Sequence, residues 1–162
     1  MQLEFPGTYA PAPPAVSIVL PDDWRPLIAP GSLMAAVKQT VGSTFVANVI
    51  VTWVRESVEF RLDEAAAALD AELRAQPEAA MLEPVEAEFD GLRGVGRAAA
   101  FNQPDVGAVA QFHIMFLVPG EGLSDLVHVT STLGGDRVDQ DFPEVRQILR
   151  SVEVRPVTST SR

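Results

Sequence analysis

Cysteine is absent from this sequence, basic residues are few and long apolar segments are missing, and each absence excludes a class of function. Without cysteine the chain forms neither disulfides nor thiolate nucleophiles nor thiolate metal sites. The 12 lysines and arginines are outnumbered by 22 aspartates and glutamates, which gives a formal net charge of −10. This charge repels nucleic-acid phosphates and anionic membrane surfaces. We therefore expect no nucleic-acid partner and no direct membrane insertion.

The apolar runs are too short to cross a bilayer. Runs such as Ile114–Val118 fall well below the ~20 apolar residues that a transmembrane helix needs. The N-terminal segment Met1–Pro14 contains Glu4 and scattered prolines instead of the continuous apolar core of a signal peptide, and no lipobox cysteine follows it. The sequence thus predicts a protein that is made and kept in the cytoplasm.

The length of 162 residues suits one domain with a single hydrophobic core. Prolines and a glycine dominate residues 1–15 and favour an extended N-terminal arm. We expect the folded α+β domain over residues 16–154. Residues 155–162 carry little apolar character and are expected to form a flexible C-terminal tail.

Segments with β-type residues follow the arm. We expect strands at Val16–Leu20, Leu33–Val41, Phe45–Glu56, Glu83–Phe89, Leu92–Phe101, Ala108–Val118 and Leu123–Leu133, with a last short strand at Val152–Val154. Gly42-Ser43-Thr44 and Asp90-Gly91 are typical of tight turns between antiparallel neighbours. Together these segments predict a single-domain α+β fold with an antiparallel sheet of about six strands flanked by helices.

The segment around Val51 carries apolar side chains on both of its faces. Val49, Val51 and Trp53 point one way, whereas Ile50 and Val54 point the other way. A strand that is apolar on both faces is expected at the centre of a covered sheet.

Two helices are expected to cover this sheet. The first begins with Asp63 as its N-cap and ends before Pro77, with a buried stripe formed by Leu62, Ala66, Leu69 and Leu73. The second runs from about Pro143 to Arg150, with Asp141 as its cap and an apolar side formed by Phe142, Val145, Ile148 and Leu149. Trp24 follows a predicted turn and is expected to fold back over the core.

The two histidines form the candidate polar site. If Phe112 faces Val129 across two neighbouring strands, the same register places His113 directly opposite His128. Gln111, Thr130 and Thr132 then share the face of these histidines. This arrangement suits a two-histidine metal site, an acid–base pair, a pH-sensitive interface or a polar strand face partly covered by a helix.

Other motifs indicate no catalytic chemistry. No serine lies in a Gly-x-Ser-x-Gly elbow, and the glycines of Gly91–Gly96 lie between antiparallel strands instead of opening a helix. The acidic clusters lack the spacing of a calcium loop and suit solvated faces and caps. We therefore assign no catalytic, cofactor-binding or metal-binding residue, expect no cofactor, and predict that the chain is not an enzyme.

The apolar excess on several strands indicates a binding surface. Two helices do not obviously cover both faces of the sheet, which leaves apolar area for a homodimer interface or for an apolar peptide. The candidate partner-binding residues are Val49, Val51, Trp53, Met115 and Leu117. Burial by the loops of the chain is the alternative.

The order of these elements is similar to that of a known family. The comparison rests on Val16–Trp24, Asn48–Arg55, the helix from Asp63, Phe89-Asp90-Gly91-Leu92, Gln111–Leu117 and Leu149-Arg150-Ser151-Val152. Over about residues 16–154 the chain resembles the PsbP and Mog-like superfamily, particularly its bacterial DcrB-like and LpqN-like branches. The resemblance implies an α/β/α sandwich built on an antiparallel sheet, and members that mostly bind proteins.

The two branches imply different roles. Some DcrB-like relatives are chaperones for secretion-system effectors, often as dimers, whereas LpqN-like relatives are actinobacterial envelope lipoproteins. Our main hypothesis is a non-enzymatic protein-binding accessory factor, such as a chaperone or adaptor for an effector or an assembled complex. The alternatives are an LpqN-like envelope-associated binding protein and a small metal-binding protein or enzyme that uses His113 and His128.

Overall fold

The computed structural model describes residues 4–7, 10–40, 45–89, 91–120 and 122–155, and for residues 85–89 it describes the backbone. Within these ranges the elements are β1 (Ala15–Ser17), β2 (Trp24–Leu27), β3 (Met34–Lys38), β4 (Asn48–Ser57), α1 (Leu62–Arg74), β5 (Ala80–Met81), β6 (Val85–Phe89), β7 (Leu92–Gln103), β8 (Gly107–Pro119), β9 (Leu123–Gly134), the 3-10 turn η1 (Gly135–Arg137), α2 (Val138–Arg150) and β10 (Glu153–Arg155). No helix in the described ranges has both the length and the apolar character to cross a membrane.

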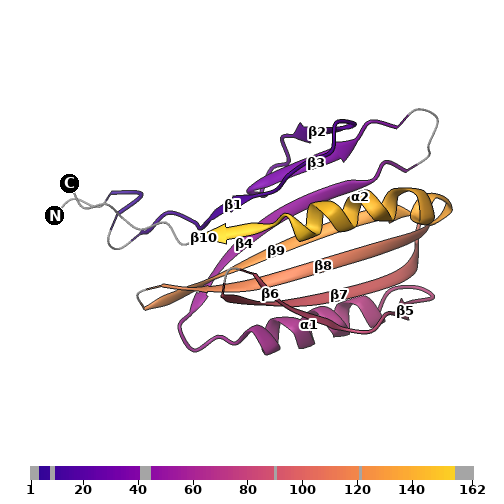
Figure 1. The fold of residues 1–162 in the computed structure, drawn as a ribbon. Coiled ribbons are helices and arrows are strands. Elements are labelled where there is room, and N and C mark those ends of the chain that lie inside the picture. The colour runs from indigo at the N-terminus through magenta and orange to yellow at the C-terminus, as the bar shows by residue number, and fades with distance from the viewer. Residues whose placement is uncertain (1–3, 8–9, 41–44, 90, 121, 156–162) are drawn as a thin grey trace.

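One large antiparallel sheet forms the centre of the domain (Figure 1). Its strand order is β2-β3-β4-β9-β8-β7-β5, and β6 also pairs with β7. A second, two-stranded sheet pairs β1 with β10, so the first and last described strands lie side by side. The antiparallel α+β fold is confirmed, and the main sheet has eight described strands instead of about six.

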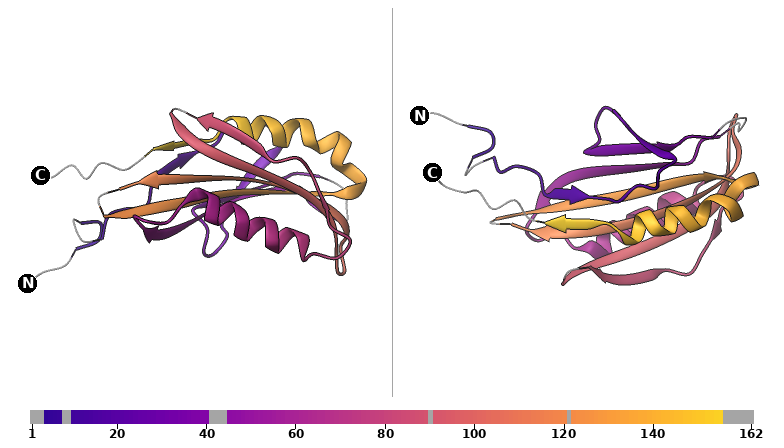
Figure 2. Two further views of the ribbon diagram at one scale, coloured as in Figure 1. Left: turned by 90° about the horizontal axis from the view of Figure 1, so that it is seen from below. Right: turned by 45° about the horizontal axis from the view of Figure 1, so that its top comes forward.

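The two α-helices lie on opposite faces of the main sheet, as Figure 2 shows. Within the sheet, α1 packs mainly against β5, β7 and β8, whereas α2 packs mainly against β9. The helices therefore cover different halves of the sheet on its two faces. We call these the α1 face and the α2 face.

Each face contributes to its own hydrophobic cluster. On the α2 face, Val49 and Val51 of β4 are completely buried and pack with residues of β8, β9 and α2. On the α1 face, Met115 of β8 packs against the buried stripe of α1. The central position predicted for β4 is confirmed, because it lies between β3 and β9. Trp24 is buried in the first cluster, as predicted.

An ion-pair network fixes α2 to the sheet. The Nζ of Lys38, on β3, lies 3.0 Å from Asp141 Oδ1, 2.7 Å from Glu144 Oε2 and 3.5 Å from Asp23 Oδ2. Trp24 Nε1 donates to Glu144 Oε2 at 2.9 Å. Burial disfavours the charged form of Lys38, but its bonds to Glu144 and Asp141 outweigh burial and raise its pKa.

Both predicted helix caps were wrong. The N-cap position of α1 is Arg61, which makes no side-chain cap, and Asp63 lies in the first turn and pairs with Arg93. Asp141 lies inside α2 because η1 leads directly into Val138, several residues before Pro143. Asp141 is 2% exposed, and its carboxylate binds Lys38, so it neutralises a buried cation instead of capping a helix end.

The remaining differences concern the ends of the chain and one edge. Strand β2 was not predicted, because Pro26 disfavours strand assignment, and the structure places it at the outer edge, where a missing N–H is tolerated. Strand β1 covers Ala15–Ser17 instead of Val16–Leu20. The predicted turn Gly42-Ser43-Thr44, residue Asp90 of the second turn and most of the predicted tail lie outside the described residues.

Candidate functional site

The histidines meet on the α1 face of β8 and β9, although not in the predicted register. The observed register pairs His113 with Thr130 and Met115 with His128, a shift of two residues. Such a shift preserves the face of every side chain because strands have a period of two. His113 Nδ1 therefore still lies 3.0 Å from His128 Nε2.

Thr130 completes a small polar group between the rings. Its Oγ1 lies 3.3 Å from both His113 Nδ1 and His128 Nε2. Gln111 Nε2 donates to Thr132 Oγ1 at 3.2 Å on the same face, as the shared face predicts. The other ring nitrogen of His113, Nε2, is buried without a hydrogen-bond partner.

Burial keeps both imidazoles neutral. It lowers the pKa of His113 to about 3, with a further contribution from the charge of His128. Burial also lowers the pKa of His128 to about 4. Such weak bases do not suit general acid–base catalysis near neutral pH, for which a pKa close to the working pH is best.

A metal site at this position would need more ligands. A structural zinc ion takes four ligands, and neutral imidazole nitrogens supply two of them here. Among the described residues, no group of three or more His, Cys, Asp or Glu side chains is placed to hold a metal ion. The arrangement is a buried hydrogen-bonded pair that joins β8 to β9.

The structure divides the predicted partner-binding residues between the two faces. Val49, Val51 and Trp53 lie on the α2 face, and Met115 and Leu117 lie on the α1 face. Val49 and Val51 are 0% exposed and Met115 is 2% exposed, so these three side chains contact the core of the chain itself. The apolar character that suggested a shared binding surface reflects burial on both faces of the sheet.

Trp53 occupies a different environment. Its Nε1 donates to Asp125 Oδ1 at 2.9 Å, and the guanidinium carbon of Arg55 lies 5.1 Å from its ring centroid. Arg55 Nη1 also donates to the carbonyl oxygen of Pro11 at 3.0 Å. This cluster fixes part of the N-terminal arm against β4.

One part of the α1 face remains open beyond the helix. Because Leu27 pairs with Ala35 and Ala35 pairs with Ile50, these residues share a face, and Val54 follows on β4. Leu27 and Val54 are each 51% exposed. We define Leu27, Val37, Ile50 and Val54 as the β2–β4 patch. Sequence reasoning missed it because Leu27 lies on the unpredicted strand.

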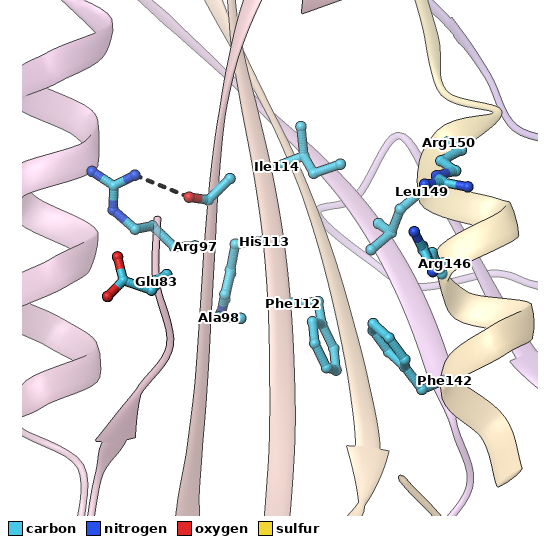
Figure 3. A pocket seen from close by; sticks show the side chains of 11 residues that line it. Glu83, Arg97, Ala98, Phe112, His113, Ile114, Phe142, Arg146, Leu149 and Arg150 are labelled. Atoms are coloured by element: carbon cyan, nitrogen blue, oxygen red, sulfur yellow. Dashed lines mark hydrogen bonds between the residues drawn. The ribbon is translucent and has the colours of Figure 1, made fainter. Parts of the chain in front are cut away.

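The α2 face is hollowed on the opposite side of the sheet, between α2 and β7 (Figure 3). A cavity of about 180 Å³ lies there, and we call it the α2 groove. Its apolar lining comes from Gly96, Ala98, Phe112, Ile114, Phe142 and Leu149. Arg146 and Arg150 of α2 and Glu83 also line it. The one sequence signal for this site is the spacing of the two arginines, four residues apart on one helix.

Comparisons with known proteins give the fold a name. A comparison of the sequence with models of protein families found no match, and a comparison with the sequences of curated proteins found none either. Among solved structures, LpqN of Mycobacterium tuberculosis, described as involved in cell envelope biogenesis, superimposes with a TM-score of 0.77 at 12% identity, covering 92% of this chain and 88% of that chain. Cyanobacterial PsbP (CyanoP) of Synechocystis sp. PCC 6803 gives a TM-score of 0.58 at 12% identity and 86% coverage of each chain.

A eukaryotic protein shares the same architecture. The Ran-binding protein Mog1p of Saccharomyces cerevisiae superimposes with a TM-score of 0.52 at 12% identity, covering 86% of this chain and 89% of that chain. In all three comparisons the match extends over most of both chains. The chain therefore has the PsbP/Mog-like fold, as its sequence resemblance predicts.

Proposed function

We propose that this chain is a non-enzymatic accessory factor that binds another protein through the β2–β4 patch. The observation that carries the proposal is the exposure of Leu27 and Val54 on a sheet face that α1 leaves open. Exposed apolar patches are typical of protein interaction sites. The fold supports this class of function, because it is shared with a protein described as Ran-binding.

We expect the partner to contact the side chains of the patch and not to add a strand to the edge of the sheet at β2. Strand β2 is the outer strand of the sheet, and Pro26 within it has no N–H to donate. Ile28, which follows β2, is 95% exposed. An apolar segment of an effector or of a complex under assembly has matching chemistry, which supports a role as a chaperone or adaptor.

Charged substitutions in the patch test the proposal. We expect the wild-type chain to retain a specific partner from an extract of its native host, and the Leu27→Lys/Val54→Lys variant to lose it. A lysine ammonium in an apolar interface remains unpaired and loses hydration, so the affinity for the purified partner should fall at least tenfold, or ~1.4 kcal/mol. Calorimetric titration of the purified pair measures this change.

The matched control carries the same charges elsewhere. Val19 and Val58 are exposed and lie outside the patch, so Val19→Lys/Val58→Lys should bind the partner like the wild type. Circular dichroism establishes that all variants are folded. Wild-type affinity in the Leu27→Lys/Val54→Lys variant would refute the role of the patch. Light scattering shows whether the partner is a second copy of the chain.

The likeness to LpqN favours a more specific form of the proposal. LpqN is described as involved in cell envelope biogenesis, and its TM-score of 0.77 exceeds the values for the other two structures described above. In this form the retained partner is an envelope component. A partner from a secretion system or from another assembled complex supports the chaperone or adaptor form instead.

A further inference from the structure

The α2 groove forms because β7 carries small residues on the α2 face and α2 does not pack closely over them. On the α2 face, β7 contributes Gly96, which has no side chain, and Ala98, whose methyl group fills little space. Within the sheet, α2 packs mainly against β9, which is two strands away from β7 in the strand order. A space therefore remains between α2 and β7 (Figure 3).

Aromatic and aliphatic side chains line this space. The rings of Phe112 and Phe142 lie with centroids 4.7 Å apart and tilted by 32° to each other. Ile114 on β8 and Leu149 on α2 continue the lining, and Figure 3 shows these side chains pointing between strand and helix. Apolar surface of this kind favours an apolar group over water.

Two arginines of α2 line one side of the groove. Arg146 and Arg150 are both exposed and lie one helical turn apart. Within the described part of the chain neither guanidinium group makes an ion pair or a hydrogen bond. Arg55, Arg97 and Arg137, by contrast, each bind an aspartate. Two unpaired guanidinium groups one turn apart therefore place positive charge beside an apolar groove, in a chain with a net charge of −10.

The size of the groove limits what it accepts. Its volume of about 180 Å³ is below the roughly 300–1,000 Å³ of pockets that enclose a whole small-molecule ligand. The space suits one large side chain, whereas a long acyl chain would remain largely in water. Guanidinium groups bind carboxylates with two parallel hydrogen bonds. The Glu83 carboxylate at the groove requires the acidic groups of a ligand to lie on the α2 side.

We propose that the α2 groove binds an acidic peptide segment, which inserts one aromatic or aliphatic side chain between α2 and β7 and places its carboxylates against Arg146 and Arg150. This site is independent of the β2–β4 patch, because it lies on the other face of the sheet. Its recognition combines an apolar anchor with charge, whereas the patch is apolar.

Binding of a defined peptide set to the full chain tests this proposal. The probes are acetylated and amidated five-residue peptides with a central phenylalanine or leucine flanked by aspartate or glutamate, and the same peptides with lysine in the flanking positions. We expect amide NMR signals of groove residues such as Phe112 and Leu149 to shift with the acidic peptides and not with the lysine peptides. The affinity should fall as salt screens the arginines.

Two variants test separately the charges of the arginines and the shape of the groove. Arg146→Gln/Arg150→Gln should weaken peptide binding at least tenfold, or ~1.4 kcal/mol. Ala98→Leu fills the groove from β7 and should weaken binding while retaining both arginines. The matched control, Arg61→Gln/Arg74→Gln, removes the same charge from exposed positions of the other helix and its N-cap, and should bind like the wild type.

Several results would overturn the proposal. The first is that no acidic peptide binds with a dissociation constant below about 1 mM. The second is that the lysine peptides bind as tightly as the acidic peptides, and the third is that Arg146→Gln/Arg150→Gln retains the wild-type affinity. Dodecanoate serves as the competing probe. If it shifts the same signals and binds more tightly than any peptide, the groove is a site for fatty acids and the peptide proposal falls.

Discussion

The imidazoles of His113 and His128 share one hydrogen bond on the α1 face of the sheet, where burial disfavours a charged ring. The Nδ1 and Nε2 atoms lie 3.0 Å apart, so one ring donates its N–H to the lone pair of the other. Protonation of both rings would remove that acceptor and place two positive charges together. The neighbouring cation, Arg97, lies opposite His113 on β7 and is paired with Asp70 of α1.

The histidine pair predicts a loss of stability in acid. The folded-state pKa of each ring is below the unfolded value of 6.5, so the unfolded chain binds more protons as the pH falls. The free energy of unfolding should therefore decrease as the pH falls from 6.5 toward the folded-state pKa values, which are about 4 for His128 and about 3 for His113. Each histidine contributes a slope of up to ~1.4 kcal/mol per pH unit. Urea unfolding across this window measures the slope.

The control for this prediction retains the polar atoms. Asparagine at position 113 approximates Nδ1 and glutamine at position 128 approximates Nε2, but neither takes up a proton in this range. The His113→Asn/His128→Gln variant should therefore lose stability less steeply than the wild type as the pH falls. Parallel pH profiles for the two proteins would show that carboxylates such as Asp141 account for all of the dependence.

The meeting of the histidines could be predicted from the sequence, but their register could not. Alternation places both on one face, and neighbouring strands bring them close. The offset along the strands depends on the connection at Gly120, whose N–H donates to the Leu123 carbonyl oxygen at 2.9 Å. A shift of two residues exposes no apolar side chain on the wrong face, so the pattern alone does not choose between the two registers.

At the scale of elements, Lys38 connects β3 to α2 through contacts that local sequence does not indicate. Its nearest buried partner, Asp141, is 103 residues away along the chain. Burial raises the pKa of Asp141, but hydrogen bonds from Arg137 and Lys38 outweigh it and lower the pKa overall. The predicted role of Asp141 as a cap rested on its position before Pro143, where a cap is common. Tertiary pairing determined its role instead.

Removal of the lysine predicts a large destabilisation. Lys38→Met leaves Asp141 buried with Arg137 as its remaining cationic partner, and the broken network should cost ~3–5 kcal/mol in the free energy of unfolding. Addition of Asp141→Asn to this variant removes the buried charge and should recover part of the loss. Urea unfolding of both single variants and the double variant measures their coupling. Additive effects would show that the two side chains do not interact in the folded state.

The long strands could be predicted because their own side chains carry the signal. Strands β4, β7, β8 and β9 lie within a few residues of their predicted ranges. Strand β2 could not be predicted, since its pairing with β3 compensates for Pro26 at an edge. The start of α2 was also missed, because η1 leads into this helix before the expected cap.

At the scale of the whole molecule, the sequence indicates apolar strand faces but not which helix covers them. Both Val51 and Met115 lie on strongly apolar strands, yet one packs toward α2 and the other toward α1. Coverage depends on where each helix lies across the sheet, which is a property of the assembled domain. The open regions, the β2–β4 patch and the α2 groove, therefore appear only in the folded structure.

The positions of these two regions predict independent binding. They lie on opposite faces, and β2 and β7 are separated in the strand order by β3, β4, β9 and β8. Ligands at distant sites without shared contacts should bind additively. An acidic peptide in the groove should therefore leave the affinity of the patch for its protein partner unchanged. Equally, Arg146→Gln/Arg150→Gln should weaken peptide binding alone, and Leu27→Lys/Val54→Lys should weaken partner binding alone.

Titration of each variant with both ligands measures the coupling between the two sites. A change of fivefold or more in the affinity for the partner when the peptide is bound, or about 1 kcal/mol, would show that the two faces communicate through the sheet.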